Sequence, residues 1–328
     1  MLLLLGLVAI ALAFDFMNGR NDAANSIATI VSTRVLAPRY AVAWAAFFNF
    51  VAFLVFGVNV ASTVGKGIID PAIISDDVVF GALVGAICWQ TITGYFGIPS
   101  SSSHALIGGL VGAGLYRAGP HAIVWEGLEK TAGAIVISPI TGLALALLLV
   151  LIVSWVFIRV VPAKADAIFR RVQFLSASAY ALGHGGNDAQ KTMGIITALL
   201  YAHGELQGDF HVPFWVILTC NGAMALGTLL GGWRIVHTMG SRITRLSPMQ
   251  GVCAETAGSI TLFMATGLGI PVSTTHTITG AIVGVGAARR ASAVRWGVAR
   301  RIVMAWVITM PAAAGIGAVC CAIASAIW

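Results

Sequence analysis

Four stretches of this chain are apolar over about 20 residues or more, the length that a helix needs to cross the hydrocarbon core of a bilayer. They cover residues 39–62, 131–158, 212–232 and 302–327. Inside a bilayer no water is present to bind the backbone, so each stretch must satisfy its own N–H and C=O groups by forming a helix. The sequence therefore predicts an all-α polytopic membrane protein.

The composition agrees with this class. Hydrophobic residues make up 58% of the 328 residues and charged residues only 9%, too few to cover the surface of a soluble protein. The first apolar run, residues 1–14, lacks the basic start and small-residue cleavage site of a signal peptide, so we expect it to be the first transmembrane helix. The five cysteines lie in apolar runs without metal-ligand spacing, so neither a structural metal nor a cofactor is expected.

The basic residues separate the loops into two sets. One set holds fourteen of the nineteen, namely Arg34, Arg39, Arg159, Lys164, Arg170, Arg171, Arg234, Arg242, Arg245, Arg289, Arg290, Arg295, Arg300 and Arg301. The opposite set holds three, Lys66, Arg117 and Lys130, with seven acids. By the positive-inside rule, the first set of loops lies in the cytoplasm and both termini lie outside it. The protein is therefore expected in the cytoplasmic membrane. The net charge of +7 thus reflects topology, and the expected partner is the lipid bilayer, with no nucleic acid.

A few charged residues lie within apolar sequence: Asp15, Asp22, Asp188, Lys191 and Glu255, with Arg20 as a borderline case. Each costs about 2.5–3.5 kcal/mol at mid-membrane on insertion scales. Such residues usually mark a substrate or ion pathway. The alternative is an internal salt bridge that only holds helices together.

Two motifs occur twice, in the same order. The stretch Asn18–Ser26 returns as His184–Thr192 after 166 residues, and Gly97–His104 returns as Gly269–His276 after 172 residues. The chain therefore divides into a first transmembrane repeat (1–158), a basic cytoplasmic linker (159–171) and a second repeat (172–328). Each half is expected to cross the membrane three times and to enter and leave it once more on the same side around its Gly-Ile-Pro motif. The number of full crossings in each half is then odd, so the second half must run in the opposite direction. Inverted-topology repeats with broken or re-entrant helices, and a site between them, are a common transporter plan.

The second motif carries Gly-Ile-Pro followed by hydroxyl residues. Proline interrupts a helix, and Ser100–Ser103 or Ser273–Thr275 can cap the helix that restarts. The new N-terminus has unpaired N–H groups and a partial positive charge, so two such termini that face each other predict an oxyanion site. The alternative for either copy alone is a proline kink.

The first motif complements this anion site. Gly and Asn permit an unwound turn whose oxygen atoms suit a hard cation, and Asp22 and Asp188 add negative charge. His104 and His276 close the second motif and are either proton carriers or donors to a nearby carbonyl. Three residues, Gln90, Lys191 and Glu255, are auxiliary candidates for the same cavity.

The four motif copies resemble those of the inorganic phosphate transporter (PiT) family, in particular its bacterial low-affinity phosphate permeases. The resemblance covers the whole chain and implies cation-coupled symport of inorganic phosphate by alternating access, with sodium or protons as the coupling ion. By position it implies cation ligands or their neighbours at Asn21, Asp22, Asn25, Asn187 and Asp188. It also implies that the anion is held by Ser101, Ser102, Ser103, Ser273, Thr274 and Thr275. The substrate can be free phosphate or a metal–phosphate complex, and assembly as a homodimer is open.

One position departs from the family pattern. Where the signature places a second Asn in the later copy, this chain has Lys191. An ammonium group there can take the place of a bound cation or contact the phosphate. The departure weakens the expectation of strict sodium dependence and favours protons.

Other classes fit less well. A passive anion channel needs a pore lining that is neutral or of one sign, whereas here buried acids accompany the anion motifs. An intramembrane hydrolase needs one catalytic centre, but the motifs form two symmetric ones, so no catalytic residues are expected. Within transporters the close alternative is sulfate or another tetrahedral oxyanion.

The topology can be checked with single cysteines in a cysteine-free background. Cysteines at Asp76 and Asp209 should react with an impermeant thiol reagent added outside intact cells, because both positions lie in the acidic loops. Cysteines at Lys164 and Arg242 should react only after the membrane is opened. Labelling of all four positions from one side would contradict the inverted-repeat model.

Overall fold

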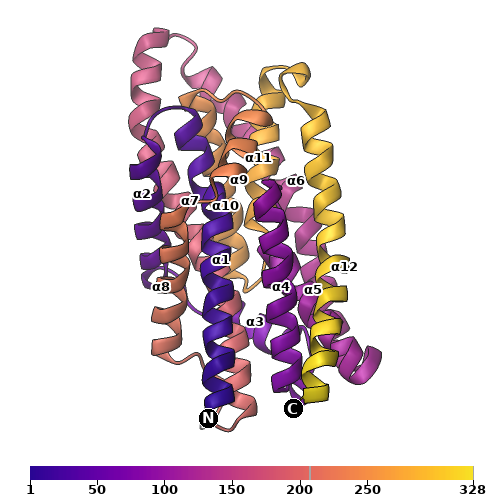
Figure 1. Ribbon diagram of the computed structural model, residues 1–328. Coiled ribbons are helices and arrows are strands. Elements are labelled where there is room, and N and C mark those ends of the chain that lie inside the picture. The colour runs from indigo at the N-terminus through magenta and orange to yellow at the C-terminus, as the bar shows by residue number, and fades with distance from the viewer. Residues whose placement is uncertain (207, 328) are drawn as a thin grey trace.

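The computed structural model describes residues 1–206 and 208–327. These residues are almost entirely helical and form no β-strand. Figure 1 shows a bundle of long helices with both ends of the chain at the same end of the molecule. From that end α1 runs toward the opposite end, whereas α7 runs back toward the termini. This arrangement confirms the all-α class.

The order of elements in the first half is repeated in the second. The first half contains α1 (Leu2–Ser32), α2 (Pro38–Val51), η1 (Ala52–Leu54), α3 (Asn59–Gly67), η2 (Pro71–Ile73), α4 (Asp76–Phe96), α5 (Ser102–Ala118), η3 (Gly119–Ala122) and α6 (Trp125–Val156). The second contains α7 (Pro162–Ala202), α8 (Phe214–Leu230), α9 (Trp233–His237), the π-helical turn η4 (Thr238–Arg242), α10 (Pro248–Gly267), α11 (Thr274–Arg289), η5 (Ala291–Ala293) and α12 (Trp296–Ile327). Each half thus has a long helix, a bent pair, a helical hairpin and a second long helix.

Four of the described helices, α1, α4, α6 and α12, are long and apolar enough to cross a membrane. Two bent pairs raise the number to six if each counts as one span. One pair runs from α2 to α3 with a bend of 82°, and the other runs from α8 to η4 with a bend of 65°. The chain is therefore a multi-pass membrane protein.

The bend between α2 and α3 corrects the expectation of an unbroken span over residues 39–62. The helix stops at Leu54 and restarts at Asn59. The Gln190 side chain of α7 explains the restart, because its oxygen accepts the N–H groups of Val60 at 2.9 Å and Ala61 at 3.2 Å. These two donors have no partner within their own helix, so a side chain from the other half caps α3.

Both hairpins turn at the predicted Gly-Ile-Pro motifs. Gly97 ends α4 in the left-handed conformation (φ 66°), and Gly269 adopts the same conformation (φ 70°) after α10. The next helices begin with the expected caps, since Ser101 accepts the N–H of His104 and Ser273 accepts the N–H of His276. The predicted helix breaks and serine caps are thus present in the structure.

The segment between the halves differs from the expected linker. Residues 162–171 form the first turns of α7, a helix of 41 residues, so only residues 157–161 connect it to α6. Arg170 pairs with Asp166 one turn earlier, at 2.8 Å, on the exposed side of this extension.

Contacts between the halves occur in reciprocal pairs. Ser103 donates to the carbonyl of Val272 at 3.1 Å, and Thr275, 172 residues after Ser103, donates to the carbonyl of Ser100 at 3.4 Å. Two threonines outside the hairpins also bind the hairpin turns: Thr63 donates to the carbonyl of Gly269, and Thr238 donates to the carbonyl of Gly97. This exchange, with the opposite directions of α1 and α7, supports the proposal that the halves are inverted repeats.

Glycines let each hairpin pack closely on the last helix of the other half. A Cβ atom at Gly108 or Gly112 of α5 would lie 2.5 or 2.0 Å from a backbone oxygen of α12. Gly280 and Gly284 of α11 have the equivalent contacts with α6, at 2.2 and 2.6 Å. Small residues four positions apart are typical of close helix packing in membranes, where dispersion rather than the hydrophobic effect holds helices together.

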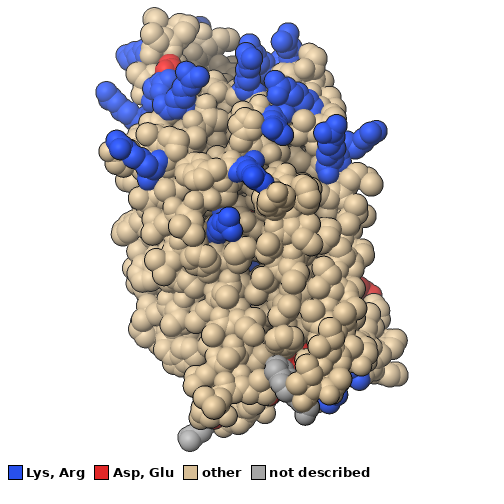
Figure 2. Space-filling view, in the orientation of Figure 1, with Lys and Arg blue, Asp and Glu red and all other residues tan. Residues whose placement is uncertain are grey.

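The exposed charges follow the predicted division. Figure 2 shows lysine and arginine side chains gathered at the end of the molecule opposite the termini, and a middle zone that is largely free of charge. The uncharged zone is what a lipid-facing surface requires, because charged side chains at that depth are costly.

The glycine contacts predict a strong effect of one methyl group. In detergent, Gly112→Ala should clearly lower the unfolding temperature, because the added carbon would overlap the backbone of Ala314. Overpacking of this kind costs about 1–3 kcal/mol or more. Gly315→Ala on α12 is the matched control, since its Cβ would meet nothing within 4 Å. Equal unfolding temperatures for both variants would contradict the close packing of α5 on α12.

Candidate functional site

The candidate site lies at the middle of the molecule, between two apolar clusters. On α1 the first cluster ends at Phe14 and the second begins at Ala24. On α7 one cluster ends at Ala181 and the other begins at Ala189. The segments between these positions carry the two Asn-Asp motifs, and the tips of both hairpins reach the same level. Polar side chains are thereby gathered in one buried layer.

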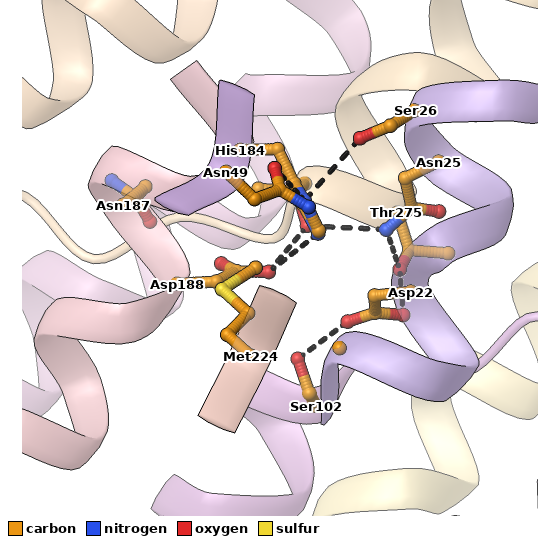
Figure 3. A network of polar contacts seen from close by, with 12 residues as sticks. Asp22, Asn25, Ser26, Asn49, Ser102, His184, Asn187, Asp188, Met224 and Thr275 are labelled. Atoms are coloured by element: carbon orange, nitrogen blue, oxygen red, sulfur yellow. Dashed lines mark hydrogen bonds and ion pairs between the residues drawn. The ribbon is translucent and has the colours of Figure 1, made fainter. Parts of the chain in front are cut away.

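Asp22 joins the two hairpins. Its carboxylate accepts a hydrogen bond from Ser102 of the first hairpin at 2.7 Å and one from Thr275 of the second at 3.2 Å. Its exposed fraction is 3%. Figure 3 shows Asp22 on α1 facing Asp188 on α7, with Ser102 and Thr275 beside it. A single carboxylate thus holds hydroxyls from both halves of the chain.

Asp188 has a different set of partners. Lys191, one turn along α7, donates to one carboxylate oxygen, and Thr274 donates to the other at 2.8 Å. The Nε2 atom of His184 lies 3.3 Å from this second oxygen. The Lys191 ammonium also donates to Ser103 at 2.5 Å and to the carbonyl of Val272 at 2.9 Å. Lys191 therefore links Asp188 to both hairpin tips.

The asparagines of the motifs hold the hairpins. Asn25 donates to Thr274 at 3.2 Å and to Thr275 at 3.0 Å. Asn21 donates to the backbone carbonyl of Gln90 on α4, within its own half. Asn187 donates to Thr266 of α10 and accepts the N–H of Val272. Their amides fix the hairpins relative to α1 and α7, a positioning role that the sequence did not indicate.

The N-termini of α5 and α11 meet at this cluster. The hydrogen bonds of Ser103 and Thr275 cross between the two tips, so both partially positive helix ends lie beside Asp22 and Asp188. The two aspartates and Lys191 carry a formal charge of about −1 in total when His184 is neutral. An oxyanion that entered this cluster would add negative charge and would require a cation.

His184 was not assigned a role from the sequence. It is fully buried, and its Nδ1 atom lies 3.3 Å from Ser26 Oγ and 3.2 Å from Asn49 Oδ1. Ligand atoms of Asp22, His184 and Asp188 all lie within 4.8 Å of one another, close enough to hold one cation. A signal was present, because His184 stands where the first motif has Asn18.

Glu255 is not part of the cluster. It accepts hydrogen bonds from Gln173 at 3.0 Å and Ser176 at 2.5 Å, two residues near the start of α7. These hydrogen bonds are to side chains of α7 and not to the hydroxyls of the hairpin tips, so a place for Glu255 in the same cavity stays a prediction. Gln90 is buried near Asn21, but its side-chain amide has no hydrogen-bond partner among the described residues.

The two motif histidines pack against each other. The ring centroids of His104 and His276 are 4.4 Å apart, and His276 stacks on Trp306 at 3.7 Å. Neither ring nitrogen of His104 has a hydrogen-bond partner in the described part of the chain. His104 therefore does not donate to a neighbouring carbonyl, which was one of the two roles expected for it.

A cavity of about 660 Å³ reaches the tip of the first hairpin from the basic end. Its wall includes Thr93 and the turn Gly97–Pro99, and Arg242, Arg300 and Arg301 also line it. Thr93 accepts a hydrogen bond from Ser100 at 2.7 Å. The wall of this cavity is thus one hydrogen bond away from the hydroxyl residues of the cluster.

Comparisons with known proteins agree with one another. Residues 18–317 match the model of the Phosphate transporter family. A protein of Rhizobium meliloti named "Probable low-affinity inorganic phosphate transporter" is 71% identical over 97% of this chain and 95% of its own length. A protein of Bacillus subtilis with the same name is 45% identical over 95% and 94%. A solved structure named "The sodium-dependent phosphate transporter" is 25% identical, covers both chains fully and has a TM-score of 0.92.

The buried pair of Lys191 and Asp188 can be tested by stability. Lys191→Met should lower the unfolding temperature strongly, because removing one partner leaves a buried charge at a cost of about 3–5 kcal/mol. The double variant Lys191→Met with Asp188→Asn should recover much of the loss. The control is Lys130→Met, which removes an exposed ion pair and should leave the unfolding temperature unchanged. A single variant as stable as the unaltered protein would contradict the pairing.

Proposed function

The chain belongs to the phosphate transporter family, and we propose that it is a secondary active transporter that carries inorganic phosphate together with a cation across the cytoplasmic membrane. Phosphate is its transported substrate. The observation that supports coupling best is Asp22, because one buried carboxylate binds hydroxyls from both hairpins. A cation at Asp22 and an anion at the hairpin tips would then share the same hydroxyl groups.

The anion is proposed to bind at the tips of the hairpins. Ser102, Ser103, Thr274 and Thr275 point their hydroxyls into the cluster, while Ser101 and Ser273 cap the helices behind them. Hydroxyls and the first N–H groups of two helices are the donors that a phosphate group needs. In the described arrangement Ser102 and Thr275 donate to Asp22, and Thr274 donates to Asp188. Phosphate must therefore draw these three hydroxyls away from the carboxylates.

This competition gives coupling a physical source. When Ser102 and Thr275 turn to phosphate, Asp22 loses its donors and becomes an unpaired buried charge. A cation that binds Asp22 compensates the lost hydrogen bonds, so each ligand favours the other, and by linkage the effect is reciprocal. The proposed cation ligands are those implied by the family resemblance, Asn21, Asp22, Asn25, Asn187 and Asp188, with His184 as an addition.

Lys191 makes the two motifs unequal. Its counterpart in the first copy is Asn25, which carries no charge. Because the Lys191 ammonium already contacts the Asp188 carboxylate, the Ser103 hydroxyl and the Val272 carbonyl, we propose that it occupies the place of one exchangeable cation. The remaining coupling ion is a proton or sodium, and a metal ion that enters with phosphate would meet the same oxygen ligands.

The bent pairs and hairpins support alternating access between inverted repeats. The cavity beside Gly97–Pro99 gives the first hairpin access from the basic end, proposed to be cytoplasmic. Both hairpin turns accept a hydrogen bond from outside the hairpins, Gly97 from Thr238 and Gly269 from Thr63, but Gly269 does not line this cavity. If such a cavity opened at the second hairpin while the cavity at the first hairpin closed, the site would become accessible from the other side of the membrane.

The proposal is tested with purified protein in proteoliposomes. Labelled phosphate should enter when an inward sodium gradient or an inward proton gradient is imposed, and the two gradients are applied separately. Asp22→Asn should reduce gradient-driven uptake by about tenfold or more, because the loss of a charge interaction worth over 1.4 kcal/mol has at least this effect. Equal uptake without any gradient would indicate a channel instead.

Two controls accompany this experiment. Asp76→Asn removes a carboxylate that contacts His203 far from the cluster and should leave uptake unchanged. Sulfate at the same concentration as phosphate should not displace it, because sulfate carries no proton near neutral pH to donate to a buried carboxylate. Displacement by sulfate would contradict selective recognition of phosphate.

A further inference from the structure

The part of the polar layer nearer the chain termini holds a carboxylate that the proposed site does not use. Asp15 lies on α1, two helical turns before Asp22, or roughly 10 Å along the helix axis. It is 0% exposed, and neither of its carboxylate oxygens has a hydrogen-bond partner among the described residues. A charged carboxylate cannot remain in such a place without compensation, because its desolvation costs several kcal/mol.

Two more unpartnered polar atoms belong to the side chains next to Asp15. The polar side chains close enough to interact with its carboxyl group are those of Asn18 and Thr192. The Oδ1 atom of Asn18 and the Oγ1 atom of Thr192 are both buried and without a hydrogen-bond partner in the described residues. Four unsatisfied oxygen atoms thus belong to three neighbouring side chains on α1 and α7, a concentration that native proteins avoid unless a ligand completes it.

We propose that Asp15, with Asn18 and Thr192 at the ends of the two Asn-Asp motifs, is a proton-binding site of the transport cycle, separate from Asp22 and Asp188. This inference rests on the proposed function, because it assigns the proton as a coupling ion of the same transporter. It adds a residue to which neither of the repeated motifs gives a role.

Donor and acceptor counting favours a proton over a metal ion. The Thr192 hydroxyl can donate to one oxygen of Asp15, but Asn18 Oδ1 only accepts and has no donor facing it. One proton on the second oxygen of Asp15 supplies that donor, so all four oxygen atoms are then satisfied. A metal ion would have only these four oxygens, fewer than hard cations such as Ca²⁺ or Mg²⁺ take.

The repeat itself marks Asp15 as an addition. The position equivalent to Asp15 in the second half is Ala181, and the position equivalent to Lys191 in the first half is Asn25. Between α1 and α7 the chain therefore departs from its own repeat by one buried negative charge and one buried positive charge. If the Lys191 ammonium replaces an exchangeable cation, Asp15 restores one exchangeable positive charge by taking up a proton.

The surroundings of Asp15 suit a transient charge. The titratable groups that interact with it are Asp188 and Lys191 on α7 and Cys220 on α8. Cys220 and Phe14 belong to the apolar cluster on the side of the chain termini. Asp15 thus lies between this cluster and the Lys191–Asp188 pair, on the proposed outer side of Asp22, where a proton from outside would arrive before the substrate site.

The test is made in proteoliposomes that contain a pH-sensitive dye. It compares proton-driven net uptake of phosphate with the exchange of labelled for unlabelled phosphate. Asp15→Asn keeps the shape of the side chain, and its amide can donate to Asn18 and accept from Thr192 like the protonated acid. This variant should exchange labelled for unlabelled phosphate within about twofold of the unaltered protein, but phosphate-linked proton entry and proton-driven uptake should fall about tenfold or more. Unchanged proton entry per phosphate would overturn the proposal.

Two variants and a control separate coupling from folding. Asp15→Glu keeps a titratable group and should retain proton-driven uptake. Thr192→Val removes the donor to the carboxylate and should move the pH of half-maximal uptake toward alkaline values. Asp77→Asn is the control, since Asp77 is a buried carboxylate with partners of its own in Ser75 and Arg117, and it should keep proton coupling. Equal loss in Asp77→Asn and Asp15→Asn would overturn a specific role for Asp15.

A measurement without phosphate keeps this inference separate from the proposed function. If Asp15 binds a proton in the folded state, the folded protein holds more protons than the unfolded chain, so its stability falls as pH rises. The decrease in unfolding temperature from mildly acidic to mildly alkaline pH should be smaller in Asp15→Asn than in the unaltered protein. The same pH dependence in both would contradict proton binding at Asp15, whatever the substrate of the transporter is.

Discussion

The absence of water from the membrane interior is the constraint on which this structure depends. Every buried charge must find its compensation within the protein. Asp22 and Asp188 find it in hydroxyls at the tips of two hairpins and in the ammonium of Lys191. The same hydroxyls are the best donors for an oxyanion, so the groups that stabilise the buried carboxylates are those that a substrate must capture. Structure and coupling therefore have one physical origin.

Bringing the hairpin tips together requires close packing elsewhere. The glycines of α5 and α11 allow each hairpin to touch the backbone of the last helix of the opposite half. A hairpin is thus held by α12 or α6 at its side and by an Asn-Asp motif at its tip. This cross-packing ties the two halves into one unit, because neither half can hold its own hairpin on both sides.

Much of this arrangement could be predicted from the sequence because it is encoded locally. Apolar length indicated the membrane class, proline after glycine indicated the helix breaks, and the repeated motifs indicated that Asp22 and Asp188 are equivalent. The caps by Ser101 and Ser273 followed from the residue types that helix N-termini prefer. Each of these features depends on neighbours within a few positions, so one sequence is enough to find it.

What only the tertiary structure decided is which distant residues meet. Asp22 binds a threonine 253 positions away, Gln190 caps a helix of the other half, and Glu255 accepts hydrogen bonds from Gln173 and Ser176. The role of His184 and the isolation of Asp15 also appear only after the helices are packed. The sequence by itself determined the helix breaks at the Gly-Ile-Pro motifs and indicated the buried charges, but it did not indicate the break between α2 and α3 or that both Asn-Asp motifs lie inside continuous helices. The partner of each charge depended on the packing of both halves, because hydrogen bonding acts over a few ångströms in space and is indifferent to separation along the chain.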